Sequence, residues 1–189
     1  VRLWCNTAAL SGALPEALGR FLAAHPRVDV ELEERPSQDI VQAVAAGRAE
    51  VGLVADTVDL GVLERFAFEE DRLRVVMAPG HPLAARRAVR LAEVVREPFV
   101  GLGEGSALQR LVETEAERLG EPLRYRARLR GVEEVCRVVA AGAAVAVVPR
   151  AAALRWRRPL GLRSAELREA WARRALSLCV RRQADLSPL

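Results

Sequence analysis

The sequence predicts an α/β protein in which short strands alternate with amphipathic helices. Apolar residues recur at helical spacing in several stretches, such as 10–22. Short apolar or alternating runs, such as 51–54, lie between these stretches and are bounded by turn residues. This alternation predicts parallel sheets with helices on both faces. The tripeptide Ala-Ala-Gly occurs at 45–47 and again at 140–142, each time before a strand, which agrees with two lobes of like topology.

The first elements follow from local pattern. Residues 1–5 form a short apolar run that predicts a strand. A helix is expected over 10–24, because Pro15 lies early in the pattern, where a helix tolerates it, and His25-Pro26 ends it. Apolar residues at 28, 30 and 32 alternate with acids over 28–33 and predict a half-buried strand.

The next helix is expected to have Ser37 as its N-cap and Gly47 as its stop. Three more strands are then expected at 51–54, 63–68 and 72–78.

The second half repeats this scheme. Ser106 and Gln109 have the spacing of a capping box, in which each side chain satisfies a backbone N–H of the other residue. The helix that begins there continues to Gly120. Strands are expected at 99–102, 125–130, 143–148 and 176–180; a helix is expected over 132–142, and another opens at Pro149.

The amino-acid composition excludes several classes of function. The 189 residues include 29 Lys+Arg against 25 Asp+Glu, so the formal charge is 29 − 25 = +4. All 29 cations are Arg, which excludes a Walker phosphate loop and Schiff-base or pyridoxal chemistry, because both need a Lys amine. The arginines are interleaved with acids and aromatic residues make up only 4%, so a nucleic-acid surface on this chain is not expected. A 51% hydrophobic content is that of an ordinary globular protein.

Neither a catalytic nor a metal site is predicted. Cys5, Cys136 and Cys179 are widely spaced, which suggests neither a disulfide framework nor zinc. His25 and His81 each precede a proline in a turn and have no ligand partner in sequence. No cofactor is expected. No apolar stretch reaches the ~18 residues of a membrane helix and no signal-peptide pattern is present, so we expect a cytoplasmic protein.

Three polar helix starts carry the functional prediction. The segment Gly101 to Ser106 is a glycine turn that feeds a helix, and such a helix start presents free N–H groups to an anion. Asn6-Thr7 after the first strand and Ser37-Gln38 before a helix are placed in the same way. Taken singly, Ser37 is better explained as a plain cap, whereas Thr7 and Ser106 fit a cap or turn and an anion contact equally well. Together the three favour an anion-binding pocket at strand ends.

In this order, several segments resemble the effector-binding domain of LysR-type transcriptional regulators. They are 14–18 (Leu-Pro-Glu-Ala-Leu) with Phe21 and His25-Pro26, 46–54, 78–84, 97–100 and 138–149. The resemblance implies a type 2 periplasmic-binding-protein fold, with two α/β lobes joined by crossing strands. Lobe I would comprise residues 1–70 plus 183–189, and lobe II residues 71–182. The family's N-terminal winged helix-turn-helix and linker helix are absent from this chain, so DNA binding is expected to lie outside it.

The resemblance also implies a site and partners. A small, carboxylate-like effector would bind between the lobes. Its contacts would come from Asn6, Thr7, Ser37, Gln38, Gly105, Ser106, Gly131 and Val132. Such domains form homodimers, or tetramers in the full-length protein, and the helix over 10–24 is the expected contact. We therefore expect a ligand-sensing and oligomerisation domain and not an enzyme.

Two alternatives share the fold. A stand-alone solute-binding protein of a transporter would need a signal peptide or lipid anchor. An enzyme would need an acid, base or nucleophile that converges on the cleft, and the sequence offers no such group.

Overall fold

The computed structural model describes residues 1–103, 105–182 and 184. The chain forms two compact units. Unit 1 is Val1–Asp71 with the chain from Arg174 onward, and unit 2 is Arg72–Arg173. The expected first boundary at residue 70 lies one residue from Asp71. The chain rejoins unit 1 earlier than the expected residue 183, because its last strand pairs with a strand of unit 1.

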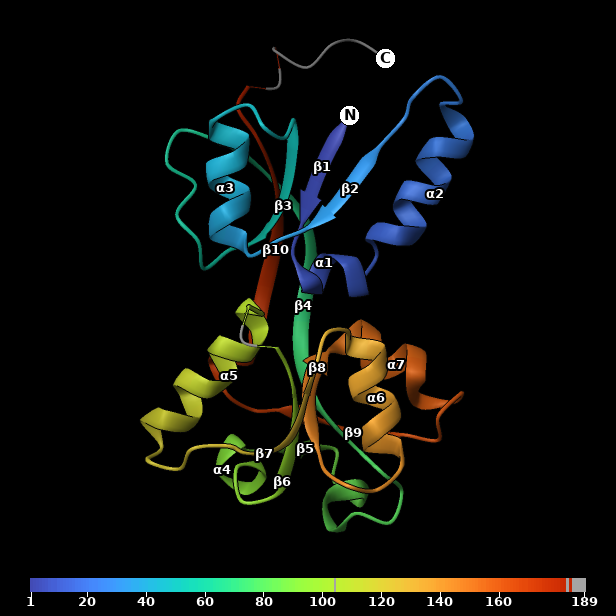
Figure 1. The fold of residues 1–189 in the computed structure, drawn as a ribbon, viewed down its shortest axis with the longest axis vertical. Coiled ribbons are helices and arrows are strands. Elements are labelled where there is room, and N and C mark those ends of the chain that lie inside the picture. Colours follow the sequence, from blue (N-terminus) through green and yellow to red (C-terminus); the bar gives the residue numbers. More distant parts are fainter. Residues whose placement is uncertain (104, 183, 185–189) are drawn as a thin grey trace. The chain divides into compact units, whose positions relative to one another are not determined.

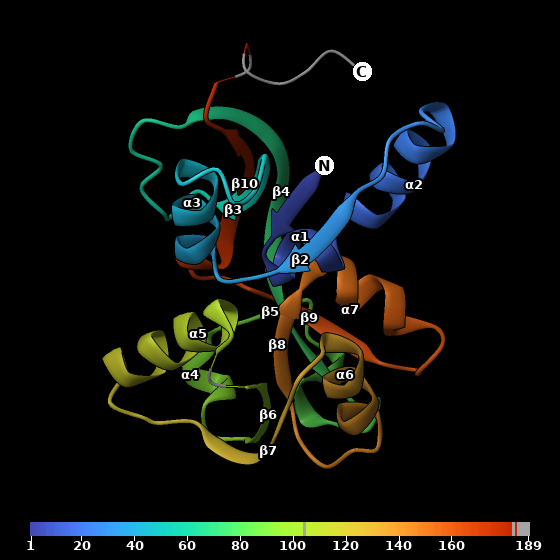
Figure 2. The same cartoon turned by 45° about the horizontal axis from the view of Figure 1, so that its top comes forward.

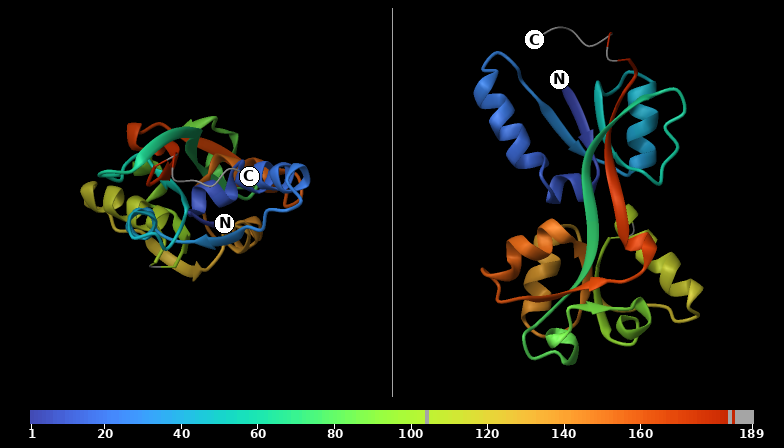
Figure 3. Two further views of the ribbon diagram at one scale, coloured as in Figure 1. Left: turned by 90° about the horizontal axis from the view of Figure 1, so that it is seen from above. Right: turned by 180° about the vertical axis from the view of Figure 1, so that it is seen from behind.

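The elements of unit 1 are β1 (Arg2–Cys5), α1 (Thr7–Ser11), α2 (Leu14–Ala24), β2 (Glu31–Glu34), α3 (Ser37–Ala45), β3 (Val51–Ala55), the first part of β4 (Glu64–Met77) and nearly all of β10 (Arg173–Val180). The sheet order is β2-β1-β3-β10, followed by β4. β1 is parallel to both β2 and β3, as predicted, whereas β10 is antiparallel to β3. In Figures 1 and 3, α2 and α3 lie on opposite sides of these strands.

Helix α3 packs directly onto β3, and glycine makes this approach possible. A Cβ atom on Gly52 would lie 2.6 Å from Ile40 Cγ2 and 2.7 Å from Cys179 Sγ, closer than real Cβ atoms come. Ile40 and Val44 of α3 are completely buried against this strand. The predicted stop of α3 is also present, since Gly47 has a φ of +73°, a conformation that glycine adopts without steric cost.

The start of unit 1 differs from the prediction. The helix expected over 10–24 is two helices, α1 and α2, separated at Gly12 and Ala13. The Ala13 N–H donates to Glu69 Oε2 at 3.0 Å instead of continuing the first helix. The strand expected over 28–33 forms at Glu31–Glu34, and its Leu32 is 37% exposed. Alternation with acids predicted a buried face, but β2 is the edge strand of the sheet.

The two strands expected at 63–68 and 72–78 form the single long strand β4. The acidic run 69–71 lies between the two expected strands. In the structure Asp71 is buried, and its carboxylate pairs with the guanidinium of Arg174 on β10. The two strands β4 and β10 lie side by side (Figure 3).

The elements of unit 2 are η1 (Pro82–Ala85), β5 (Ala88–Val89), α4 (Leu91–Val94), β6 (Pro98–Leu102), α5 (Ala107–Arg118), β7 (Arg124–Leu129), α6 (Val132–Ala140), β8 (Ala146–Pro149), α7 (Arg150–Arg157), β9 (Arg163–Leu167) and η2 (Ala170–Ala172). The second part of β4 pairs antiparallel with both β8 and β9, and β5 pairs parallel with β9. β6 and β7 form a separate parallel pair. Helices α6 and α7 pack side by side (Figure 2).

One hydrophobic core fills unit 2. Its largest side chain is Phe99 on β6, which is 1% exposed and meets the Tyr125 ring edge-on at 5.7 Å between centroids. Cys136 lies in the same core, as its place on an apolar helix stripe predicted. None of the helices in the described residues is long and apolar enough to cross a membrane.

Candidate functional site

Asn6 and Ser37 join two strand ends of unit 1 to a helix start. Asn6 is the N-cap of α1, where its Oδ1 accepts a hydrogen bond from the Ala9 N–H at 2.9 Å. Its Nδ2 donates to Ser37 Oγ at 3.2 Å, and Ser37 Oγ also accepts from the Ala55 N–H at 3.1 Å. The carboxyl ends of β1 and β3 and the start of α3 therefore meet at one buried polar cluster, as the sequence predicted for strand-end residues.

Ser37 differs from the prediction in one respect. Pro36, not Ser37, is the N-cap of α3, and Ser37 is the first helical residue. Ser37 is only 9% exposed, and its hydroxyl accepts a hydrogen bond from the neighbouring strand β3 instead of capping its own helix.

Thr7 and Gln38 flank this cluster and are more accessible. Thr7 is half-buried and its hydroxyl donates to Glu34 Oε1 at 2.5 Å, while Gln38 is exposed at the first turn of α3. The first N–H groups of α3 have no acceptor within the helix. Asn6 already uses its Oδ1 and one hydrogen of its Nδ2 within this cluster, so Thr7, Gln38 and the α3 N–H groups are the more accessible groups of unit 1 that an anion could contact. Glu34, which holds Thr7, was not identified from sequence.

In unit 2, Ser106 and Gly131 lie at the ends of paired strands. β6 and β7 run parallel with Leu102 opposite Leu129, and the Gly103 N–H donates to the Leu129 carbonyl at 2.9 Å. Ser106 is the N-cap of α5 and Gly131 that of α6, so two helix starts share this edge. Residue 104 of the glycine turn lies outside the described residues.

The capping box predicted at Ser106 and Gln109 is only half formed. Ser106 Oγ accepts from the Gln109 N–H at 3.3 Å, but the Ser106 N–H donates to the Gly103 carbonyl at 2.9 Å. Gln109 Oε1 accepts from the Leu102 N–H at 2.8 Å instead. Gly101 makes room for this contact, since a Cβ atom there would lie 2.4 Å from Gln109 Oε1.

Gln109 belongs to a polar network that sequence analysis missed. Its Nε2 donates to the Tyr125 hydroxyl, which in turn donates to Glu113 Oε1 at 2.9 Å. Burial first, and the Glu113 hydrogen bond second, raise the pKa of the Tyr125 phenol. The Arg128 guanidinium carbon lies 3.9 Å from the centroid of the Tyr125 ring. This network fixes α5, and with it Ser106, against β7.

The remaining predicted residues contribute unequally. Gly105 is exposed in the turn before α5, and Gly131 is half-buried. Val132 is 8% exposed with its side chain in the unit 2 core, so only its backbone can reach a ligand.

The three cysteines lie where side chains pack in the protein interior. All three cysteines are buried and unpaired, and burial raises the pKa of the Cys136 thiol to about 12. Within the described part of the chain, no group of three or more His, Cys, Asp or Glu side chains is placed to hold a metal ion.

His81 is not the plain turn residue that was expected: its Nδ1 accepts from the Leu83 N–H at 3.2 Å and caps η1.

The family profile of the LysR substrate binding domain matches residues 1–189. The chain belongs to this family. Its relatives include the HTH-type transcriptional regulator IlvY of Escherichia coli, 26% identical over 152 residues, which covers 79% of this chain and 51% of IlvY. The RuBisCO operon transcriptional regulator of Allochromatium vinosum is 27% identical over 134 residues, covering 71% of this chain and 44% of that protein. The LysR-family chain thus spans about half the length of these relatives.

Solved structures show the same fold. The regulatory domain of CcmR from Synechocystis PCC6803, in complex with 2-PG, matches with a TM-score of 0.83 and 21% identity over 99% of this chain and 89% of that one. The BenM effector-binding domain with its effector benzoate matches with a TM-score of 0.78 and 22% identity over 99% and 84%. The α/β architecture of this LysR substrate-binding domain is therefore that of LysR effector-binding domains, as the sequence resemblance predicted.

Proposed function

We propose that this chain is the effector-sensing part of a cytoplasmic LysR-type regulator, and that it controls a DNA-binding region carried elsewhere in the full-length protein. The family match over the whole chain is the observation that carries this proposal. Relatives about twice as long are named as transcriptional regulators, which supports the division of labour. In this proposal the chain acts by binding and not by catalysis, and the Ser37 and Ser106 hydroxyls have a structural use, since each accepts a hydrogen bond from a backbone N–H group.

The effector in this proposal is a small carboxylate-like anion, and the polar helix starts of each unit are its candidate contacts. Unit 1 contributes Thr7, Gln38 and the backbone N–H groups at the Ser37 start of α3, around the Asn6 cap, and unit 2 contributes Gly105, Ser106 and the backbone at Gly131 and Val132. Helix starts suit an anion because their N–H groups and dipole are positive there. Structural neighbours are described as complexes with 2-PG, benzoate and shikimate, all small molecules, which supports this ligand size.

Signal transfer follows from differential binding. An effector that binds one arrangement of the two units better than another shifts the population toward it, and the dimer geometry of the regulator changes with that population. X-ray scattering of the chain with and without a tight ligand is expected to differ. Identical scattering at saturation would contradict this mechanism.

A thermal-shift panel of small carboxylates, amino acids and aromatic acids tests the site. A true effector is expected to raise the melting temperature of the wild-type chain by several degrees at saturation, because a ligand that binds only the folded state stabilises it. The shift is expected to shrink in both Thr7→Ala and Ser106→Ala, one in each unit.

Thr114→Ala is the matched control, since Thr114 is an exposed threonine well inside α5 and away from its start. It is expected to keep the full shift. If the thermal shift is the same in Thr7→Ala and Ser106→Ala as in the wild-type chain, the chain still binds a ligand but not at this site.

We further propose that the chain forms a homodimer, with a tetramer as the alternative assembly of the full-length protein, and that α2 and β2 provide the contact. Leu14 is the one buried residue of α2, whereas Leu18, Phe21 and Leu22 are only half-buried. β2 is an edge strand with the exposed Leu32. An apolar helix face beside an open sheet edge is a surface that a second copy would cover.

Phe21→Glu is expected to weaken the dimer at least about tenfold in sedimentation equilibrium, because it buries a charge in an apolar contact. Val62→Glu, at a residue that is 92% exposed in the same unit, is the control and is expected to change nothing. Equal behaviour of the two variants would argue against a contact at α2.

A further inference from the structure

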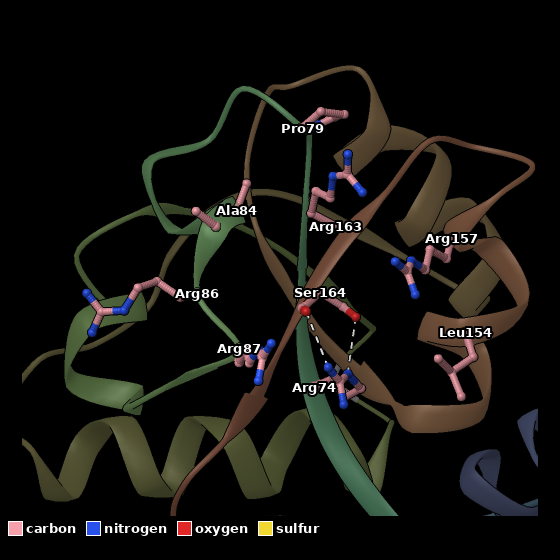
Figure 4. A pocket seen from close by; sticks show the side chains of 10 residues that line it. Arg74, Pro79, Ala84, Arg86, Arg87, Leu154, Arg157, Arg163 and Ser164 are labelled. Carbon is pink, nitrogen blue, oxygen red and sulfur yellow. Dashed lines mark hydrogen bonds between the residues drawn. The ribbon is translucent and has the colours of Figure 1, made fainter.

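A strongly cationic pocket lies wholly within unit 2. It has a volume of about 660 Å³, and five of its ten lining residues are arginines from four separate segments. Arg74 comes from β4, Arg86 and Arg87 from the link between η1 and β5, Arg157 from α7 and Arg163 from β9. It contains none of the residues proposed above for the effector. Figure 4 shows these side chains around Ser164 of β9.

The antiparallel pairing of β4 and β9 builds the floor of this pocket. Arg74 Nε donates to Ser164 Oγ at 3.1 Å and its second terminal nitrogen donates to the Ser164 carbonyl at 3.3 Å, which holds the guanidinium in place. Its side chain is only 18% exposed. In Figure 4, Arg157 points toward Arg74 and Ser164, whereas Arg86 lies at the rim and points away.

Carboxylates do not balance this charge. Arg86 pairs with Glu93 at 3.3 Å, and Arg74 lies 3.9 Å from Glu166, which is closer to Arg72 at 2.9 Å. Among the described residues, the side chains of Arg87, Arg157 and Arg163 have no hydrogen bond or ion pair. The pKa of the Arg74 guanidinium is lowered, and burial is the largest cause. The attraction of Glu166 raises this pKa, whereas the charges of Arg150 and Arg157 lower it further. A bound anion would relieve this crowding.

We propose that this pocket binds a small phosphate-bearing metabolite, whose phosphate is held by Arg74, Arg87, Arg157 and Arg163. Guanidinium groups form paired N–H···O bonds with phosphate oxygens, and a phosphate dianion offers three acceptor oxygens and up to two charges to several of them, whereas a carboxylate offers two oxygens and one charge. The volume admits an organic part beyond the phosphate. The described lining has no aromatic side chain on which a base could stack, which favours a phosphorylated sugar or acid over a nucleotide.

Isothermal titration of the chain with inorganic pyrophosphate tests this proposal. One site per chain is expected, with an affinity that falls as sodium chloride rises. Arg157→Gln together with Arg163→Gln is expected to weaken binding at least about tenfold, because charge-assisted hydrogen bonds are lost. Arg155→Gln together with Arg158→Gln is the matched control: it removes the same charge from exposed neighbours of α7 and is expected to keep the affinity within about twofold.

Other outcomes would overturn the proposal. If pyrophosphate does not bind, the pocket is not a phosphate site. If the two double variants weaken pyrophosphate binding equally, the arginines act only as a diffuse basic surface. If citrate binds more tightly than pyrophosphate, the ligand class of this pocket is a polycarboxylate and not a phosphate. A pocket variant that changes the sedimentation mass without any effect on pyrophosphate would assign the arginines to an acidic surface of a second copy. Thr7→Ala and Ser106→Ala are expected to leave pyrophosphate binding unchanged, which separates this site from the effector site.

Discussion

Asp71→Asn is expected to destabilise the protein by about 3–5 kcal/mol, because it leaves the Arg174 charge buried and uncompensated. The side chains of Asp71 and Arg174 are only 6% and 7% exposed, and the Arg174 Nε atom has no hydrogen-bond partner among the described residues. The pair ties β4 to β10 at the two points where the chain crosses between units. Urea unfolding followed by circular dichroism measures the loss.

Two variants control this experiment. Glu133→Gln breaks an exposed pair with Arg137 on α6 and is expected to cost only ~0.3–0.5 kcal/mol. Asp71→Leu combined with Arg174→Leu removes both charges and is expected to be less destabilised than Asp71→Asn, since no buried charge is left alone. A cost for Asp71→Asn no greater than that for Glu133→Gln would contradict the structural role of the pair.

Phe99→Ala is expected to cost about 3–5 kcal/mol, through lost burial and the cavity left in the core of unit 2. Phe99 is 1% exposed and packs edge-on against Tyr125, so its removal also loosens the network that fixes α5 and Ser106. The loss is measured by urea unfolding in a Trp4→Phe background, where the remaining tryptophans, Trp156 and Trp171, both pack against the unit 2 core.

Phe99→Leu refills most of the volume and is expected to lose less than half as much stability. Phe66→Ala, on an exposed part of β4, is expected to be nearly neutral. An unfolding midpoint for Phe99→Ala that matches the midpoint for Phe66→Ala would show that the core does not depend on this ring.

Long segments with a regular hydrophobic period were predictable from the sequence. Segments that are very short, or whose structure depends on contacts with distant parts of the chain, were not. The helix stripe and glycine stop of α3, and the strand-turn-helix of β6 and α5, follow from local pattern. β5 has only two residues and α4 only four, too few to show a period. β4 was divided in two because the burial of Asp71 depends on Arg174, more than a hundred residues away along the chain.

The candidate site was predictable to a similar degree. Asn6 and Ser37 lie together because parallel strands bring their carboxyl ends to one edge, which sequence order alone predicts. The side-chain use of Ser37 depends on β3, and that of Gln109 on Tyr125, so neither followed from capping rules. The arginine pocket was not predictable, because four distant segments supply it and 29 arginines give no local signal.

The central claim of the proposed function is that polar helix starts, present in each unit, are the contacts of an anionic effector. Amide chemical-shift mapping of the isotope-labelled chain, titrated with the strongest carboxylate from the thermal-shift panel, tests it most directly. Perturbations are expected at Thr7 and Gln38 in unit 1 and at Ser106 and Gly131 in unit 2, and they should saturate with one common affinity. Perturbations confined to one unit, or centred on Arg74 and Arg163, would contradict the claim.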